Sequence, residues 1–255
     1  MSSVKKLTTL TSLASLALFL LPAAQAEQID HAYQYEACIS LIEKRPETAF
    51  EAALAWASKG GGYPAEHCAA QALFGLEIYD AAASRLEGLA QTIKTEDTLL
   101  RAQILHQAGR GWMLHGDLDR AYAVQKAAID LDQSQPDFFV DRAEVLAELG
   151  RFNEALEDLN RAHTLAPQRD DILAFRATAW RFAGQNANAL SDANAALQRN
   201  PDNLEALLER GIVQRLSGNN DQARADWLRV LDIGLGTPAA DAAQINLERM
   251  DLKAE

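Results

Sequence analysis

Two cysteines and five histidines are the residues of this sequence whose types suit nucleophilic or metal-ion chemistry. Cys38 and Cys68 lie in the N-terminal part, and His67 directly precedes Cys68. Neighbouring residues of a helix point about 100° apart, so the His67 and Cys68 side chains cannot face one reacting group together. The other histidines are scattered and lack the spacing of metal ligands: His31, His106, His115 and His163.

Motifs of the common enzyme classes are also missing from the sequence. It contains no serine elbow, no HExxH pair and no glycine-rich loop that follows a strand. We therefore predict no catalytic residues, no metal site and no cofactor, and we expect that the chain is not an enzyme. An unrecognised site that combines a cysteine with a histidine is the least favoured alternative.

Arginine and aspartate recur together at a fixed spacing. Three arginines are 34 residues apart, and an aspartate follows each of them sixteen residues later. The preceding stretch has Ala108 and Val124 at these positions, so charge occurs at both places or at neither. An arginine that faces a groove between helices needs an anionic partner. We predict structural ion pairs between Arg142 and Asp158, Arg176 and Asp192, and Arg210 and Asp226.

These charges belong to a repeat of 34 residues that runs from about Leu99 to Leu235. Small residues keep the same step, and a fixed period of this length is typical of a stacked repeat array. The glycines are expected to form left-handed turns between helices, and the alanines to lie where helices cross closely. The matching rows are Gly116, Gly150, Gly184 and Gly218; Ala121, Ala155, Ala189 and Ala223; and Ala128, Ala162, Ala196 and Val230.

Residues 1–26 have the features of a secretory signal peptide. Lys5 and Lys6 precede an apolar stretch over residues 7–21, and Ala-Gln-Ala at residues 24–26 offers a cleavage site. A membrane anchor is the alternative, but a spanning helix needs about 20 apolar residues, and this stretch is shorter. No later segment is apolar enough to span a membrane, so no insertion is expected after cleavage. We predict a periplasmic protein, with secretion as the alternative.

Export places the two cysteines in an oxidising compartment. Cys38 and Cys68 are therefore predicted to form a structural disulfide. Their separation of thirty residues is about that of equivalent helices in neighbouring hairpins, and each lies on an apolar helical face. Two separate buried thiols are the alternative.

The balance of charge argues against nucleic acid as a partner. The formal net charge is −12, whereas binding to phosphates requires a basic face. We interpret the acidity as a contribution to solubility.

Helical periodicity runs through the whole chain after the signal peptide. Residues 27–95 are predicted to form degenerate helical hairpins, because their repeat is out of register. Residues 96–236 hold four regular units, and residues 237–255 are predicted to form a helix that caps the last unit. The four units cover about residues 102–135, 136–169, 170–203 and 204–236.

The regular units resemble tetratricopeptide (TPR) repeats. The run from Arg151 to Leu156 is similar to that family's turn and second-helix start, and Pro167 and Pro201 match its unit ending. The resemblance implies an all-α, right-handed α/α superhelix of antiparallel helix pairs. It also implies a concave groove, lined by the first helices, that often holds a peptide. The matching groove positions make these residues candidates: Gln103, His106, Arg110, Glu144, Thr178, Arg181, Phe182 and Arg215.

The predicted function is a non-catalytic scaffold of the bacterial cell envelope that binds a protein or peptide in this groove. A self-associating structural module is the alternative. It would form a homodimer through the alanine-rich N-terminal hairpins.

Overall fold

The computed structural model describes residues 30–252 of the chain. The predicted signal peptide lies outside the described residues, as do residues 253–255 at the end of the predicted cap. Thirteen helices occur in the described part, all within one compact unit, His31–Glu255. They are α1 (His31–Ile42), α2 (Pro46–Ser58), α3 (Gly62–Gly75), α4 (Tyr79–Thr92), α5 (Thr98–His115), α6 (Leu118–Leu131), α7 (Pro136–Glu148), α8 (Phe152–Leu165), α9 (Asp170–Phe182), α10 (Asn186–Arg199), α11 (Leu204–Leu216), α12 (Asn220–Ile233) and α13 (Pro238–Asp251).

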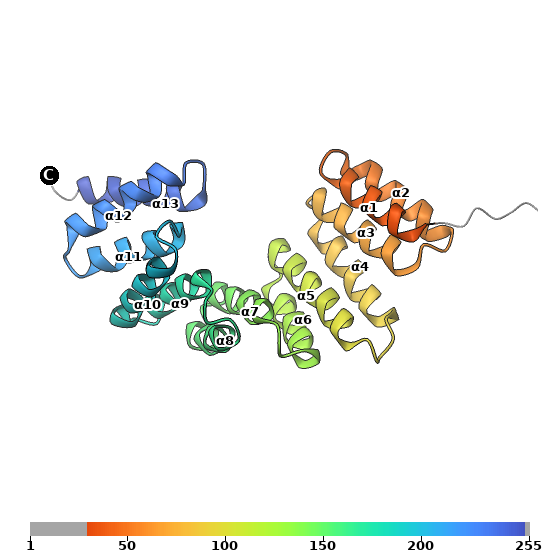
Figure 1. The fold of residues 1–255 in the computed structure, drawn as a ribbon, viewed down its shortest axis with the longest axis horizontal. Coiled ribbons are helices and arrows are strands. Elements are labelled where there is room, and N and C mark those ends of the chain that lie inside the picture. Colours follow the sequence, from red (N-terminus) through yellow and green to blue (C-terminus); the bar gives the residue numbers. More distant parts are fainter. Residues whose placement is uncertain (1–29, 253–255) are drawn as a thin grey trace, which may run out of the picture. The chain divides into compact units, whose positions relative to one another are not determined.

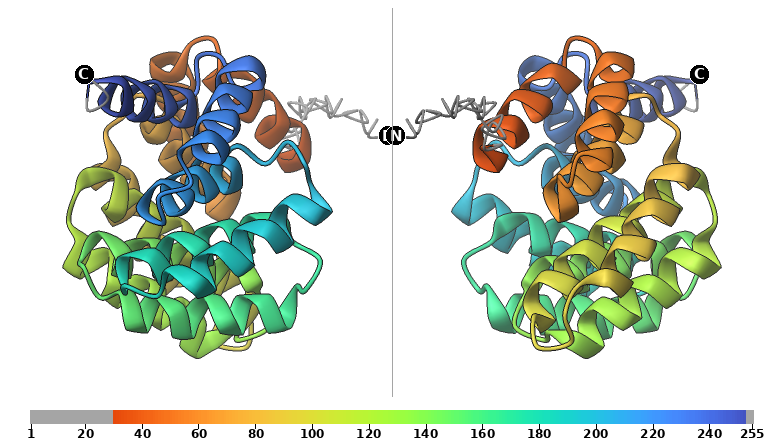
Figure 2. Two further views of the ribbon diagram at one scale, coloured as in Figure 1. Left: turned by 90° about the vertical axis from the view of Figure 1, so that its left-hand side faces the viewer. Right: turned by 90° about the vertical axis from the view of Figure 1, so that its right-hand side faces the viewer.

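Each helix packs against the next helix along the chain, and neighbours run in opposite directions (Figures 1 and 2). First helices of adjacent hairpins also touch, as α9 does with α11. Residues 30–252 contain no β-strand, which confirms the prediction of an all-α fold of helix pairs. None of the described helices has both the length and the apolar composition needed to cross a membrane.

Local sequence signals set the helix ends. Proline occupies the first turn of α2, α7 and α13, where its missing N–H costs no helical hydrogen bond. The Asn203 side chain accepts from the Ala206 N–H at 2.8 Å and so caps the start of α11. The helix α5 begins at Thr98, four residues before the expected start of the first regular unit. No proline or cap residue near Ala102 makes the helix begin there.

The recurring glycines form the turns between the two helices of each unit. Gly116, Gly150, Gly184 and Gly218 have φ angles of 90°, 72°, 76° and 83°. This left-handed conformation strains residues that carry a Cβ, whereas glycine adopts it freely. The prediction of left-handed turns is confirmed at all four positions.

The recurring alanines fill the closest helix crossings. Every residue in the two alanine rows, including Val230, is fully buried with 0% exposure. Their methyl groups let the helices approach each other, so the spacing of the array depends on these small side chains. The N-terminal alanines proposed as a dimer face are buried in the same way, for example Ala53, Ala69 and Ala83.

At one position of the first helix, two units have alanine (Ala143 and Ala177) and the other two have glycine (Gly109 and Gly211). The glycines leave room for a larger side chain on the second helix. A Cβ on Gly109 would lie 2.7 Å from Cγ of Gln125, and a Cβ on Gly211 would overlap the Trp227 indole. Gln125 and Trp227 are fully buried and occupy the same repeat position. Each donates to the equivalent carbonyl of the first helix, that of His106 or Leu208.

The three predicted Arg–Asp pairs are in contact, each between the two helices of one unit. Arg142 donates Nε and Nη2 to Asp158 at 2.7 and 2.6 Å, and the other two pairs have the same two bonds. The hydrogen bonds to Asp158 raise the pKa of Arg142. Arg176 donates a further bond to Asn160 of the preceding unit at 3.0 Å. The pairs therefore connect the two helices of each unit, and Arg176 also connects its unit to the preceding one.

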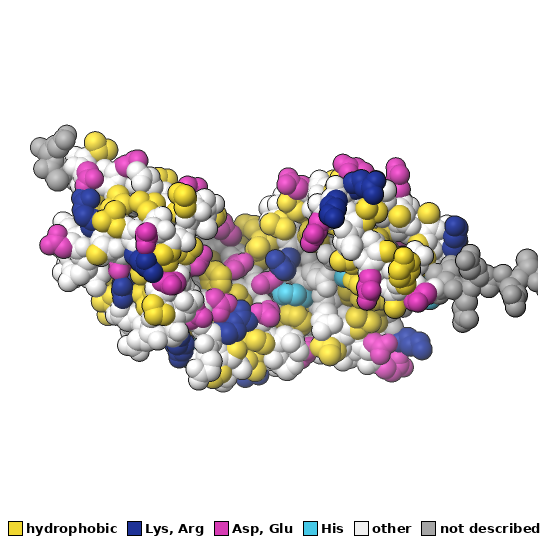
Figure 3. All heavy atoms as spheres, turned by 45° about the horizontal axis from the view of Figure 1, so that its top comes forward, with side chains coloured by type: hydrophobic (Ala, Val, Ile, Leu, Met, Phe, Trp, Pro, Cys, Tyr) yellow, Lys and Arg dark blue, Asp and Glu magenta, His cyan; other side chains and the backbone are white. Residues whose placement is uncertain are grey.

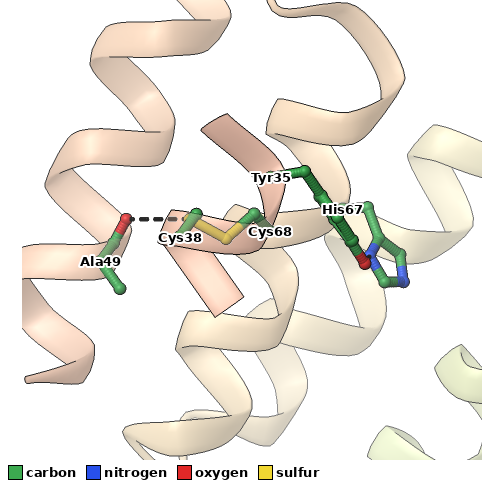
Figure 4. Close-up of a disulfide and its surroundings, with 5 residues drawn as sticks. All are labelled: Tyr35, Cys38, Ala49, His67 and Cys68. Atoms are coloured by element: carbon green, nitrogen blue, oxygen red, sulfur yellow. Dashed lines mark hydrogen bonds between the residues drawn. A yellow bond between two sulfur atoms is a disulfide. The ribbon is translucent and has the colours of Figure 1, made fainter. Parts of the chain in front are cut away.

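A disulfide joins Cys38 of α1 to Cys68 of α3, with the Cα atoms 6.4 Å apart (Figure 4). Both residues are buried in a small apolar cluster that also contains Ala53 and Ala69. The covalent link holds the first helix against the first helix of the next hairpin, where the regular repeat is absent.

Candidate functional site

The inner helices α5, α7, α9 and α11 carry the eight groove residues expected from the sequence. Figure 3 shows a hollowed face over the middle helices, where hydrophobic side chains lie beside acidic, basic and histidine side chains. The eight residues do not form one site. Three of them line a pocket, two approach a half-buried aspartate, one is bound to a buried glutamate, and Gln103 and Arg215 line neither of the two pockets described below.

The first pocket lies between α7, α8 and α9 and has a volume of about 320 Å³. The backbones of α7 and α9 do not pack together as those of α9 and α11 do, which leaves this space open. Its walls are largely apolar, and its polar side chains are Glu144, Glu148 and Thr178. The apolar lining is Val140, Ala143, Ala147, Phe152, Ala155, Leu159, Phe175, Ala179 and Phe182.

An aromatic stack forms one edge of this pocket. The Phe182 ring of α9 lies on the Phe152 ring of α8 with the centroids 4.9 Å apart and the planes 8° apart. The Arg181 guanidinium lies 4.1 Å from the Phe182 centroid. Phe182 is nevertheless 53% exposed, so a rigid apolar surface faces solvent beside the pocket.

Arg181 is not a free cation of the groove. Its Nε donates to Oε1 of Glu209 in α11, and the Thr178 hydroxyl donates to the other carboxylate oxygen at 3.3 Å. Glu209 is only 3% exposed. This arginine therefore compensates a buried carboxylate, which sequence reasoning missed because the partner lies in the next unit.

His106 and Arg110 of α5 both approach Asp141 of α7. His106 Nε2 is 3.3 Å and Arg110 Nε is 3.4 Å from the same carboxylate oxygen. The His106 ring also stacks on Phe138 with centroids 4.5 Å apart. Burial raises the pKa of Asp141, and the charges of His106 and Arg110 oppose that rise.

Glu144 and Glu148 lie one turn apart on α7 and have no hydrogen bond or ion pair with any described residue. Burial raises the pKa of Glu144 to about 7, and the charges of Asp141 and Glu148 act in the same direction, while Arg110 opposes them. This part of the inner face is therefore acidic, because Arg110 and Arg181 are already paired with Asp141 and Glu209.

A second pocket, of about 590 Å³, lies between α1, α3 and α5 beside the disulfide. Tyr35 of α1 approaches His67 of α3, with its hydroxyl oxygen 2.9 Å from Nδ1 (Figure 4). His67 Nε2 is 2.9 Å from the Gln107 amide oxygen, so this nitrogen carries the proton and Nδ1 accepts from the tyrosine. Burial lowers the pKa of His67. Sequence reasoning did not select this network, because it combines degenerate hairpins with the first regular unit.

No cluster of three or more potential metal ligands occurs within residues 30–252. The Cys38 and Cys68 sulfur atoms are bonded to each other, and His67 points toward Tyr35 (Figure 4). The cysteine–histidine alternative therefore has no thiolate nucleophile in the disulfide-bonded protein.

Solved structures with the same arrangement of helices are TPR proteins. The C-terminal part of a TPR repeat-containing protein from Cytophaga hutchinsonii superposes with a TM-score of 0.62 at 15% identity, covering 78% of each chain. YrrB superposes with a TM-score of 0.54 at 18% identity, covering 82% of this chain and 98% of its own. The chain has the tetratricopeptide-repeat fold.

Another TPR-type match is MamA from Desulfovibrio magneticus RS-1, with a TM-score of 0.59, 16% identity and coverage of 69% of this chain and 97% of that one. The sequence family described as the bacterial transcriptional activator domain matches residues 80–205, just under half of this TPR chain. No curated protein matches the sequence significantly.

Proposed function

We propose that this TPR protein is a non-catalytic scaffold of the bacterial cell envelope that binds a protein or an extended peptide on its inner face. The observation that carries the proposal is the exposed Phe182 ring at the edge of the apolar pocket between α7, α8 and α9. Exposed aromatic surface beside a pocket is typical of protein interaction sites. YrrB, which has the same fold, is described as a TPR protein with an unusual peptide-binding site.

The pocket supports peptide binding because packing holds its walls in place. The Phe152–Phe182 stack and the Arg181–Glu209 ion pair fix the position of the aromatic edge. A site that is formed before binding loses little conformational entropy when a ligand enters. Nucleic acid is not included in the proposal, because the net charge of −12 would repel phosphates.

Binding can be tested by selecting a displayed library of random twelve-residue peptides on the purified protein. We expect enriched peptides whose affinity falls at least tenfold when Phe182→Ser removes the aromatic edge. Leu228→Ser is the matched control, since Leu228 is 51% exposed and lies on α12, the second helix of the last unit. Failure to enrich any peptide, or equal losses with the two variants, would contradict binding on the inner face.

The envelope location rests on residues 1–26. Osmotic-shock fractionation of cells, followed by mass spectrometry of the intact protein, tests it directly. We expect the chain in the released fraction to begin at Glu27. A chain that begins at Met1 and stays with the cytoplasmic fraction would contradict export.

A further inference from the structure

The pocket between α7, α8 and α9 combines apolar walls with two carboxylates that lack a partner in the described chain. Glu144 and Glu148 both line it, whereas Arg110 and Arg181 are engaged with other carboxylates. Arg110 pairs with Asp141, and Arg181 pairs with Glu209. An acidic ligand would therefore meet two carboxylates that have no ion-pair partner in the described chain.

The size of the pocket limits what can enter it. Its volume of about 320 Å³ lies at the small end of the roughly 300–1,000 Å³ typical of ligand sites. One bulky side chain fits this space, and the small Ala143, Ala147 and Ala155 leave room for it between the helices. The Phe152 and Phe182 rings supply a flat apolar contact at the edge.

We propose that this pocket receives an aromatic or branched aliphatic side chain of a peptide whose adjacent lysine or arginine pairs with Glu144 and Glu148. The inference rests on the proposed function and specifies the chemistry of the partner. The two carboxylates are one helical turn apart, so a single cation lying over the turn can interact with both.

Charge complementarity makes the basic residue the selective part of this ligand. Glu144 is partly withdrawn from water, so its attraction to a cation is stronger than that of a fully solvated carboxylate. A cation would also relieve the repulsion among Asp141, Glu144 and Glu148. A peptide with an acidic residue in the same place would add to that repulsion and is rejected.

The library selection described above also tests this chemistry, when the peptides enriched on the natural protein are sequenced. We expect an aromatic or aliphatic residue next to lysine or arginine in most of them. The most enriched peptide, synthesised with a fluorescein label, should bind the Glu144→Gln/Glu148→Gln protein at least tenfold more weakly. It should also bind at least tenfold more weakly when Ala147→Phe fills the pocket.

Glu51→Gln/Glu157→Gln is the matched control, because it removes the same charge from two exposed positions outside the pocket. Its affinity should stay within twofold of the natural protein. Circular dichroism melting of each variant separates loss of binding from loss of folding, and the two glutamine substitutions change no side-chain volume.

The outcomes distinguish the two proposals. Enriched peptides that are acidic or neutral, or that bind the Glu144→Gln/Glu148→Gln protein with unchanged affinity, overturn the inferred ligand chemistry. If those peptides still lose affinity with Phe182→Ser, binding on the inner face stands. If no peptide is enriched, both proposals fail.

Discussion

Arg176 and Asp192 form a two-bond ion pair between α9 and α10, with N–O distances of 2.7 and 2.8 Å. Their side chains are only 16% and 12% exposed. The third donor group of the arginine reaches Asn160 of the preceding unit. The same geometry recurs at Arg210, which reaches Asp226 and Asn194. The repeated charges therefore have a structural role, and other residues must provide the contacts to a ligand.

Asp192→Ala should destabilise the protein strongly, because it leaves the Arg176 charge half-buried without its partner. Loss of one member of a buried pair costs about 3–5 kcal/mol. Asp202→Ala is the control, since Asp202 pairs with Arg229 but its side chain is 62% exposed. Such a surface pair contributes about 0–1 kcal/mol. Urea unfolding followed by circular dichroism measures both, and equal losses would show that the inner pair has no special structural role.

Gly109 and Gly211, which stand where the other two units have alanine, give a second prediction about packing. Gly211→Ala should destabilise the protein by about 1–3 kcal/mol, because the new methyl group overlaps the Trp227 indole. Trp227→Leu in the same chain should recover part of this loss, since the pair would then match Ala143 and Leu159 of the second unit. Thermal melting checks the compensation. A double variant that is less stable than both single variants would contradict it.

The sequence predicts much of the fold because its repeat is strong. Glycine at Gly150 and alanine at Ala155 recur for steric reasons, and the structure has a left-handed turn at the first and a fully buried methyl group at the second. Sequence reasoning did not detect that Gly109 pairs with Gln125 and Gly211 with Trp227. That relation is a compensation in volume between two helices, and the identity of the larger side chain, glutamine or tryptophan, is not repeated.

The site was less predictable than the fold. Of the groove candidates chosen by position within the repeat, Glu144, Thr178 and Phe182 line one pocket. It could not reveal that Arg181 binds Glu209, because that contact joins helices of different units. Groove position determines where a residue lies, whereas its availability for a ligand depends on its neighbours in space.

The disulfide gives a prediction about the N-terminal hairpins. Cys38→Ser/Cys68→Ser should lower stability by about 3–4 kcal/mol, from the chain entropy of a closed loop of this length. Hydrogen exchange should increase mainly in α1 to α3, which the disulfide connects, and little in α9 to α12. The variant should also lose any response of its melting temperature to reductant. A variant whose melting temperature matches that of the oxidised natural protein would show that packing alone holds α1.

The raised pKa of Glu144 gives the last prediction. Burial raises this pKa from 4.5 to about 7, so the folded protein takes up a proton more readily than the unfolded chain. This group therefore lowers stability progressively as pH rises from about 4.5 to 7, and the whole penalty is present at pH 8. Glu144→Gln should raise the melting temperature at pH 8 by several degrees, with no gain at pH 4.

The control for this pH effect is Glu157→Gln, which removes an exposed carboxylate and should give the same small change at both pH values. An equal effect of Glu144→Gln at pH 4 and pH 8 would contradict the raised pKa. If Glu144→Gln both stabilises the protein at pH 8 and weakens binding of the selected peptide, the charge at position 144 is retained at a cost to folding. Such a trade-off between stability and activity is expected where a half-buried charge serves binding.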